Sequence, residues 1–266
     1  FYFSFFSLND IKRKIILSLC FLYVINIYGQ DVFSEKSINI DPMKTLMWTN
    51  KTYFLGHFEP KMHPDFVQID SMYCYRELYM IEEAYQAFVE MAKAALADSV
   101  HLKIISATRN FDYQKSLWEN KWTGKTLVEQ QKLTTTHKNF FHRALKIMEY
   151  TAPPGFTRHH WGTDIDINAV EDEYFQSEEG NIVFDWLQKN AGKFGFCQTY
   201  TAQDHLRSKG YKEEKWHWSY AKIADQIWRE QIAQFELNDI KDFKGAESVK
   251  KTNFLHDFIL SINTCH

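Results

Sequence analysis

Apolar residues recur at helical spacing in several stretches of the chain, and short runs of strand-forming residues lie between them. Amphipathic helices are predicted at 73–97, 132–150, 182–191, 221–235 and, as a last short piece, 254–262. Strands are predicted at 101–106, 165–167 and around 216–218, with 192–196 as a turn and the start of another strand. A break is predicted at 153–155, where two prolines precede a glycine, and a loop at 238–251. This pattern predicts an α+β fold, in which helices pack around a small, mainly antiparallel sheet.

The amino-terminal segment has the composition of a secretory leader. Three basic residues at 12–14 precede an apolar run at 15–25, and Gly29 offers a small residue at a cleavage position. The apolar run is shorter than the ~20 residues that a helix needs to span a bilayer. We therefore predict a signal peptide at 1–29, secretion to the periplasm, and no stable membrane insertion once the leader is removed.

The remaining segment, 30–266, is long enough for one decorated domain and is predicted as a single unit. The whole chain is 45% hydrophobic and 24% charged, which is typical of globular proteins. Its 31 basic and 34 acidic residues are mixed along the sequence and leave a formal net charge of −3. Because no basic stripe is present in the sequence, nucleic acid is not expected as a partner.

Cysteine is sparse in the chain after the leader, which contains only Cys74, Cys197 and Cys265. Three cysteines permit at most one intrachain disulfide and leave one thiol over. None of them has CxxC spacing, which argues against a zinc site built on thiolates. Cys197 is expected to be a small buried apolar residue in the first place and a disulfide partner in the second.

Two short segments, 157–166 and 214–218, contain residues that match zinc chemistry. A catalytic zinc ion needs three protein ligands from His, Asp or Glu and one open position. His159, Asp166 and His217 would provide that set. Glu214, three residues before His217, would be the nearby carboxylate that accepts a proton from water.

These segments resemble the signatures of the LAS metallopeptidases, and among them the VanY-type D-alanyl-D-alanine carboxypeptidases. The family pattern SxHxxGxxxD is matched, with threonine in place of serine, by Thr157, His159, Gly162 and Asp166. The pattern ExWH is matched by Glu214, Trp216 and His217. A third pattern upstream, SxxRxxxxQ, is matched by Ser106, Arg109 and Gln114. The resemblance extends from about 53 to 220, and 221–266 is expected to form a C-terminal helical extension.

The resemblance implies a LAS/hedgehog-like fold whose sheet holds Zn²⁺ between His159, Asp166 and His217, with Glu214 as general base. It implies that Arg109 faces the substrate and binds or polarises the reacting carbonyl or carboxylate. Gln114 and Thr157 are expected to bind substrate, although the Thr157 hydroxyl could instead bond to a metal ligand. The implied activity is hydrolysis of the terminal D-alanine from peptidoglycan stem peptides or muropeptides.

Several residues keep a second interpretation. Asp164 stands where the family pattern usually has a small residue, and its place two residues before Asp166 puts both on one face of a strand. It is expected either to orient a ligand histidine or to bind a substrate ammonium group. His160 is a rival ligand to His159, and Glu213 is a rival base to Glu214. The tryptophans of the two segments could belong to the core or to a pocket wall, namely Trp161, Trp216 and Trp218.

Other functions remain open at this point. A D-Ala-D-Ala dipeptidase or a peptidoglycan endopeptidase could use the same metal site and would differ in the shape of the surrounding loops. A zinc-containing binding module without catalysis, as in the hedgehog relatives of this fold, is a third possibility. The presence of both Glu214 and Arg109 argues against the binding module.

Overall fold

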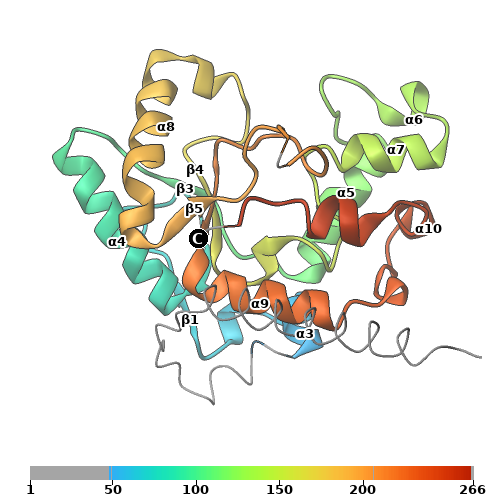
Figure 1. Ribbon diagram of the computed structural model, residues 1–266, viewed down its shortest axis with the longest axis horizontal. Helices are drawn as coiled ribbons and strands as arrows, with labels where there is room; N and C mark the ends of the chain where they lie inside the picture. Colours follow the sequence, from blue (N-terminus) through green and yellow to red (C-terminus); the bar gives the residue numbers. More distant parts are fainter. Residues whose placement is uncertain (1–47, 49, 206, 265–266) are drawn as a thin grey trace, which may run out of the picture. The chain divides into compact units, whose positions relative to one another are not determined.

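The computed structural model describes residue 48 and residues 50–205 and 207–264 (Figure 1). All of these belong to one compact unit of the chain, Met43–His266. The predicted signal peptide at 1–29 lies outside the described residues. No helix in the described ranges is long and apolar enough to cross a membrane.

The centre of the fold is a four-stranded antiparallel sheet in the order β3-β4-β6-β5. Its strands are β3 (Ile104–Ser106), β4 (Asp164–Ile167), β5 (Phe196–Gln198) and β6 (His217–Tyr220). The register pairs Asp166 with His217 and Ile165 with Trp218. Every residue of β4 and β6 is buried, so both faces of the sheet centre are covered. A separate hairpin pairs β1 (Phe66–Gln68) with β2 (Tyr79–Ile81).

Helices surround this sheet, and the α+β prediction is confirmed. They are α3 (Lys51–Phe54), α4 (Glu82–Ala97), α5 (Phe111–Trp122), α6 (Leu133–Thr136), α7 (Phe140–Ile147), α8 (Glu178–Asn190), α9 (Ala221–Ala233) and α10 (Ala246–Val249). In Figure 1, α4 and α8 lie on one side of the sheet, and α5, α7 and α10 lie on the other. Helix α7 packs against both α5 and α10, whereas α9 follows β6 directly and contacts it.

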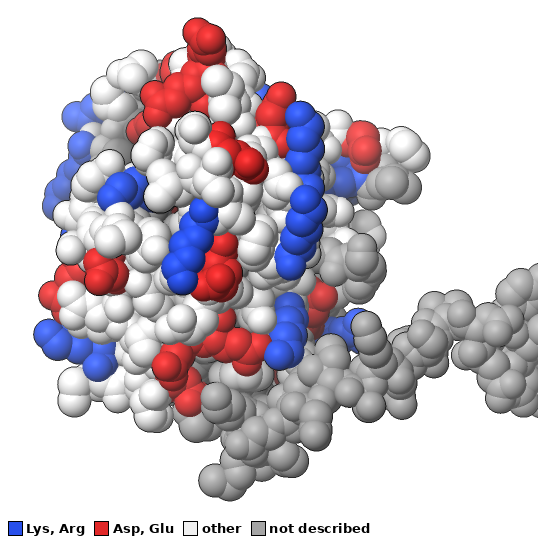
Figure 2. All heavy atoms as spheres, turned by 90° about the vertical axis from the view of Figure 1, so that its left-hand side faces the viewer, with Lys and Arg blue, Asp and Glu red and all other residues white. Residues whose placement is uncertain are grey.

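The face formed by α4 and α8 carries basic and acidic side chains close together, with no continuous area of one sign (Figure 2). On α4, for example, Lys93 Nζ lies 2.7 Å from Glu90 Oε1. The mixed charge pattern of the sequence is therefore kept on this part of the surface.

Two predicted helices differ from the observed ones. Helix α4 begins at Glu82 and not at 73, because 79–81 pairs with β1 as a strand and Ile81 donates its backbone N–H to Gly162 O at 3.0 Å. The predicted helix at 132–150 is interrupted between α6 and α7. Asn139 starts the second piece, and its side chain accepts hydrogen bonds from the first backbone N–H groups of α7.

Helix α5 was not expected from the pattern of the sequence. Its residues are polar on average, although the buried ones, Phe111, Gln114, Trp118 and Trp122, recur at helical spacing. Asn110 caps the helix by accepting a hydrogen bond from Tyr113 N at 2.8 Å. This helix carries Gln114 and forms one wall of the site described below.

The chain after β6 packs against the segments that carry the site. The Phe254 ring lies 5.1 Å from Phe156, and the Phe258 ring lies 5.2 Å from Tyr211. A predicted loop at 238–251 contains the short helix α10. These contacts make the C-terminal extension part of the support of the site.

The structure changes the expected role of Cys197 and shows the state of Cys74. Cys197 is disulfide-bonded and only partly buried, so its interpretation as a buried apolar residue in the first place is wrong. Cys74 is a buried free thiol. Its sulfur lies 3.0 Å from Arg76 O, and backbone carbonyls of this kind are the ordinary partners of a buried thiol.

Candidate active site

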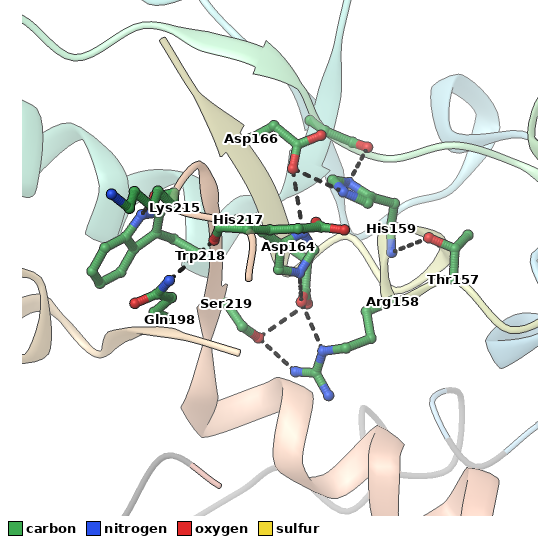
Figure 3. Close-up of polar contacts among 12 residues, drawn as sticks. Thr157, Arg158, His159, Asp164, Asp166, Gln198, Lys215, His217, Trp218 and Ser219 are labelled. Atoms are coloured by element: carbon green, nitrogen blue, oxygen red, sulfur yellow. Dashed lines mark hydrogen bonds and ion pairs between the residues drawn. The ribbon is translucent and has the colours of Figure 1, made fainter. Parts of the chain in front are cut away.

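The structure brings the three predicted metal ligands together. Donor atoms of His159, Asp166 and His217 all lie within 4.8 Å of one another, and all three residues are buried. Asp166 Oδ1 lies 3.2 Å from both His159 Nε2 and His217 Nδ1 (Figure 3). The antiparallel pairing of Asp166 with His217 places two of the ligands on neighbouring strands. His159 reaches them from a single 3-10 turn, Arg158–His160.

The backbone around His159 fixes which ring nitrogen faces the cluster. Its Nδ1 lies 3.0 Å from Ala107 O, which leaves Nε2 directed at Asp166. Thr157 caps the turn, because its Oγ1 accepts a hydrogen bond from His159 N at 3.3 Å. The turn then passes into β4 through Gly162 at φ 78°, where a Cβ atom would lie 2.5 Å from the Phe66 ring. Only glycine fits this close, left-handed position.

Asp164 lies on the far side of His217 from the cluster (Figure 3). Its side chain is completely buried, and its Oδ1 lies 3.0 Å from His217 Nε2 and 2.8 Å from Arg158 Nε. Ser219 Oγ donates to its other oxygen at 3.1 Å. The His217 ring is thus held between two carboxylates, with Nδ1 directed at Asp166. Asp164 is absent from the pocket lining, so the structure favours its orienting role and gives a substrate ammonium group no access to it.

The electrostatics of the cluster suit a cation. Burial lowers the pKa of His159 to about 4, so its ring is neutral and can offer a lone pair. Burial opposes ionisation of Asp166, but the facing histidines hold its pKa well below the usual range. Burial also opposes the charged form of His217, yet hydrogen bonds to Asp164 and Asp166 raise its pKa to about 9, so a zinc ion would take the place of the proton on this ring. Two imidazole nitrogens and one carboxylate oxygen, oriented by partners behind them, fit a catalytic zinc ion.

A pocket of about 280 Å³ opens onto this cluster. Its lining includes every predicted site residue except Asp164, namely Arg109, Gln114, Thr157, His159, Asp166, Glu214 and His217. Of the three tryptophans, Trp216 lines the pocket, whereas Trp161 and Trp218 are buried outside its lining. Lining residues that the sequence did not indicate include Lys121, Thr151, Tyr200 and Tyr211.

Glu214 is the carboxylate that faces the cluster from the pocket. Its Oε2 lies 3.8 Å from His217 Nδ1. Burial, with a further contribution from the charge of Asp166, raises the pKa of Glu214 to about 8. Its neighbour Glu213 lines a different surface hollow, which does not contain the metal cluster. The geometry therefore favours Glu214 over Glu213 as the proton carrier.

Backbone hydrogen bonds connect the segment of Arg109 with the turn that contains His159 and His160. Arg109 donates its backbone N–H to His159 O at 2.9 Å, and its Nη2 lies 3.9 Å from Asp166 Oδ2. The Nδ1 atom of His160 lies 2.6 Å from Arg109 O, and its Nε2 accepts from Gly155 N at 3.0 Å. Both ring nitrogens of His160 are thus used by the backbone, so His160 supports the loop and is not available as a ligand.

Gln114 and Arg109 each keep an unused polar atom in the pocket wall. Gln114 Nε2 donates to Ala152 O at 2.7 Å, while its Oε1 has no hydrogen-bond partner among the described residues. Arg109 Nε is also without a partner there. Buried polar atoms are rarely left unpaired in proteins, so these two atoms are polar positions next to the pocket that the described residues leave unsatisfied.

Comparisons with known proteins agree with the resemblance read from the sequence. A family model described as VanY, D-alanyl-D-alanine carboxypeptidase, matches residues 77–223. The chain is 27% identical over 218 residues to the putative carboxypeptidase YodJ of Bacillus subtilis, an alignment that covers 79% of this chain and 70% of that protein. It is 26% identical over 172 residues to a D-alanyl-D-alanine carboxypeptidase of Enterococcus faecium, covering 64% of this chain and 46% of the relative.

Among solved structures, VanYB in complex with D-alanine-D-alanine aligns with a TM-score of 0.45 at 22% identity, covering 66% of this chain and 87% of that one. The chain spans about half the length of the enterococcal relative. The family model, however, covers more than half of the 266 residues and contains all the predicted ligands. The predicted family is thereby confirmed, and the chain belongs to the D-alanyl-D-alanine carboxypeptidase family of VanY type.

Proposed function

We propose that the chain is a zinc-dependent carboxypeptidase that releases the terminal D-alanine from peptidoglycan stem peptides. The observation that carries the proposal is the shared pocket, in which the His159, Asp166 and His217 cluster faces both Glu214 and Arg109. A cluster that only stabilised the fold would need neither a buried carboxylate outside the predicted ligand set nor an arginine beside it in the pocket lining. Family membership supports peptidase chemistry at this pocket.

In this proposal His159, Asp166 and His217 hold the zinc ion. When bound there, zinc lowers the pKa of water and polarises a carbonyl group. Glu214 accepts a proton from the attacking water and returns it to the nitrogen of the leaving D-alanine. Its raised pKa suits both steps, because a carboxylate that titrates near neutral pH can take up and release a proton readily.

Arg109 is proposed to donate to the oxygen of the scissile carbonyl. Its side chain is half-buried in the pocket wall, with Nη2 3.9 Å from Asp166 Oδ2 at the edge of the cluster. A fixed donor that faces developing negative charge in a buried site lowers the barrier more than it would in water. Thr157 remains both a pocket-lining residue and a cap for His159, so its hydroxyl links substrate wall and metal ligand.

The size of the pocket supports an attack near the end of a peptide. A volume of about 280 Å³ lies below the ~300–1,000 Å³ of sites for drug-sized ligands, so it accommodates a terminal residue or two. The name of the enterococcal relative supports D-alanine at these positions. Since peptidoglycan lies outside the cytoplasmic membrane, the proposal places the enzyme there, in agreement with the expected leader and secretion to the periplasm.

Product analysis tests the proposed reaction. The purified zinc-loaded protein is incubated with muropeptides that carry pentapeptide or tetrapeptide stems, and the products are identified by mass. We expect loss of one D-alanine from the pentapeptide stem, its arrest by a chelator, and its recovery when zinc is added. Release of the D-Ala-D-Ala dipeptide would instead indicate a dipeptidase, and opening of crosslinks an endopeptidase. Binding of muropeptide without any product would indicate a non-catalytic module.

A further inference from the structure

A small cavity lies behind the candidate active site, between the segment that carries the metal ligands and the chain after β6. Its volume is about 10 Å³, and Arg158, Gln231 and a group of aromatic rings line it. Tyr200 and Tyr211 line both this cavity and the pocket of the candidate active site, so the two hollows share a wall. The chemistry proposed above makes no use of this cavity.

Two buried residues of the cavity lining each keep an unused hydrogen-bond donor. Arg158 is 4% exposed and Gln231, on α9, is 2% exposed. Arg158 Nη1 and Gln231 Nε2 have no hydrogen-bond partner among the described residues. Both atoms carry hydrogens and cannot accept from each other, so they need an acceptor from elsewhere. Because buried polar atoms are rarely left unpaired, one small acceptor in the cavity would satisfy both.

Size and charge together select the acceptor. A single water molecule needs ~10–15 Å³ of cavity measured in this way, so the cavity accommodates one water and excludes phosphate and other polyatomic anions. The charge of Arg158 is already paired, since its Nε lies 2.8 Å from Asp164 Oδ1 and both side chains are buried. A halide ion would add a buried charge without a free cation beside it, which is unfavourable. Water is therefore favoured over an anion.

The other two nitrogens of Arg158 hold the carboxylate that orients a metal ligand (Figure 3). Its Nε donates directly to Asp164 Oδ1, and its Nη2 donates to Ser219 Oγ at 2.7 Å. Ser219 Oγ in turn donates to Asp164 Oδ2, so Arg158 acts on both oxygens of this carboxylate. Asp164 Oδ1 also lies 3.0 Å from His217 Nε2. The guanidinium position is thus passed on to the His217 ring.

We propose that the cavity binds one water molecule, which accepts hydrogen bonds from Arg158 Nη1 and Gln231 Nε2. The Trp161 ring, 4.5 Å from Arg158 Cζ, supports the face of the guanidinium group, and the water fixes its outer edge. Arg158 and Gln231 are then positioning residues that connect α9 through Asp164 to the metal ligand His217. This inference concerns the support of the metal cluster and does not require that the chain cleaves a peptide.

A crystal structure of the zinc-loaded protein, at a resolution that shows ordered water, tests the site directly. We expect one peak of electron density within hydrogen-bond distance of both Arg158 Nη1 and Gln231 Nε2. A second crystal, soaked in sodium bromide, distinguishes water from an anion, because only bromide gives an anomalous signal there. A bromide peak in the cavity, a direct bond between the Gln231 amide and Arg158, or a cavity without density would each overturn the proposal.

Zinc affinity tests the connection to the metal ligand without any peptide substrate. Gln231→Met keeps the length of the side chain and removes its donor. We expect zinc affinity, measured by chelator competition, to fall by about 3- to 10-fold, less than the 10- to 100-fold for a direct partner of a ligand. Gln226→Met, on the same helix but outside the cavity lining, serves as the control and should bind zinc as the wild type does.

A third variant separates positioning from simple filling of the core. Gln231→Asn keeps the amide donor and loses volume, so it should recover most of the zinc affinity if the hydrogen bond matters. If only volume matters, Gln231→Met should bind zinc more tightly than Gln231→Asn, and the positioning role is overturned. Wild-type affinity in Gln231→Met overturns it as well. Should Gln231→Met fail to fold, the wild-type crystal structure and Gln231→Asn still decide the proposal.

Discussion

The two walls of the pocket differ in how their charges are balanced. On the wall formed by β4 and β6, Asp166 Oδ1 lies 3.2 Å from both His159 and His217. On the wall formed by α5, the ammonium group of Lys121 has the neutral hydroxyl of Thr151 as its partner. The first wall has acceptors and donors that satisfy each other or a metal ion. On the second wall, none of the described carboxylates forms an ion pair with Lys121.

Because of this difference, substitutions on the two walls are expected to affect different properties of the protein. Changes on the strand wall should alter metal content and the chemical step, since those residues contact the metal site. Changes on the helix wall should alter the choice of substrate and leave the metal in place. The following experiments are arranged from the largest expected effect to the smallest.

Removal of a metal ligand should have the largest effect. We expect His159→Ala and His217→Ala to lose bound zinc and with it all measurable hydrolysis, because two remaining protein ligands do not complete a catalytic zinc site. Elemental analysis of the purified proteins measures this, with the exposed His142→Ala as control. Wild-type zinc content in either variant would exclude that histidine from the ligand set.

Loss of the general base should spare the metal. Glu214→Gln keeps the size of the side chain, and we expect normal zinc content with turnover reduced by at least ~10²-fold. Its control is Glu213→Gln, which should remain close to wild type because Glu213 lies in another hollow. Loss of zinc from Glu214→Gln would instead make Glu214 a ligand, and an unchanged rate would assign the proton transfer to another group.

Arg109 lies where the two walls meet, and its replacement sharpens the comparison. Arg109→Ala should lower kcat/KM by ~10²- to 10³-fold, as expected for removal of a donor to the reacting oxygen. Arg109→Lys should recover only part of the rate, because an ammonium group cannot reproduce the planar guanidinium contacts. Zinc content, measured on the same preparations, should not change. A fall in zinc content would show that Arg109 supports the cluster and not the substrate.

Asp164 should have the smallest effect of the series on the strand wall. Asp164→Asn weakens the contact that orients His217, and we expect zinc affinity to fall by ~10- to 100-fold in a chelator competition assay. It also leaves Arg158 without its ion pair, so the melting temperature should fall as well. Unchanged zinc affinity in a destabilised protein would restrict Asp164 to a structural role.

The sequence indicated the metal cluster because each ligand is a chemically distinctive residue in a short segment. His159 and Asp166 lie close together in the chain around the obligatory glycine, Gly162, and His217 lies near a glutamate at fixed spacing. Local pattern also indicated the strands β4 and β6 and the helix α9 close to their observed bounds. Local chemistry and hydrophobic periodicity were enough for these features.

Contacts between distant segments decided the rest. Helix α5 is so polar on average that the hydrophobic pattern of the sequence does not predict it. Its buried side is defined by packing against other segments, among them α7. The role of Asp164 depends on Ser219 and His217, more than fifty residues away, and the position of Lys121 depends on Thr151, thirty residues away. Aspartate is usually a surface residue, and only burial beside particular partners gives Asp164 its orienting role. The sequence by itself therefore indicated the residues of the His159, Asp166 and His217 cluster, whereas the tertiary structure decided which groups orient them and which line the pocket.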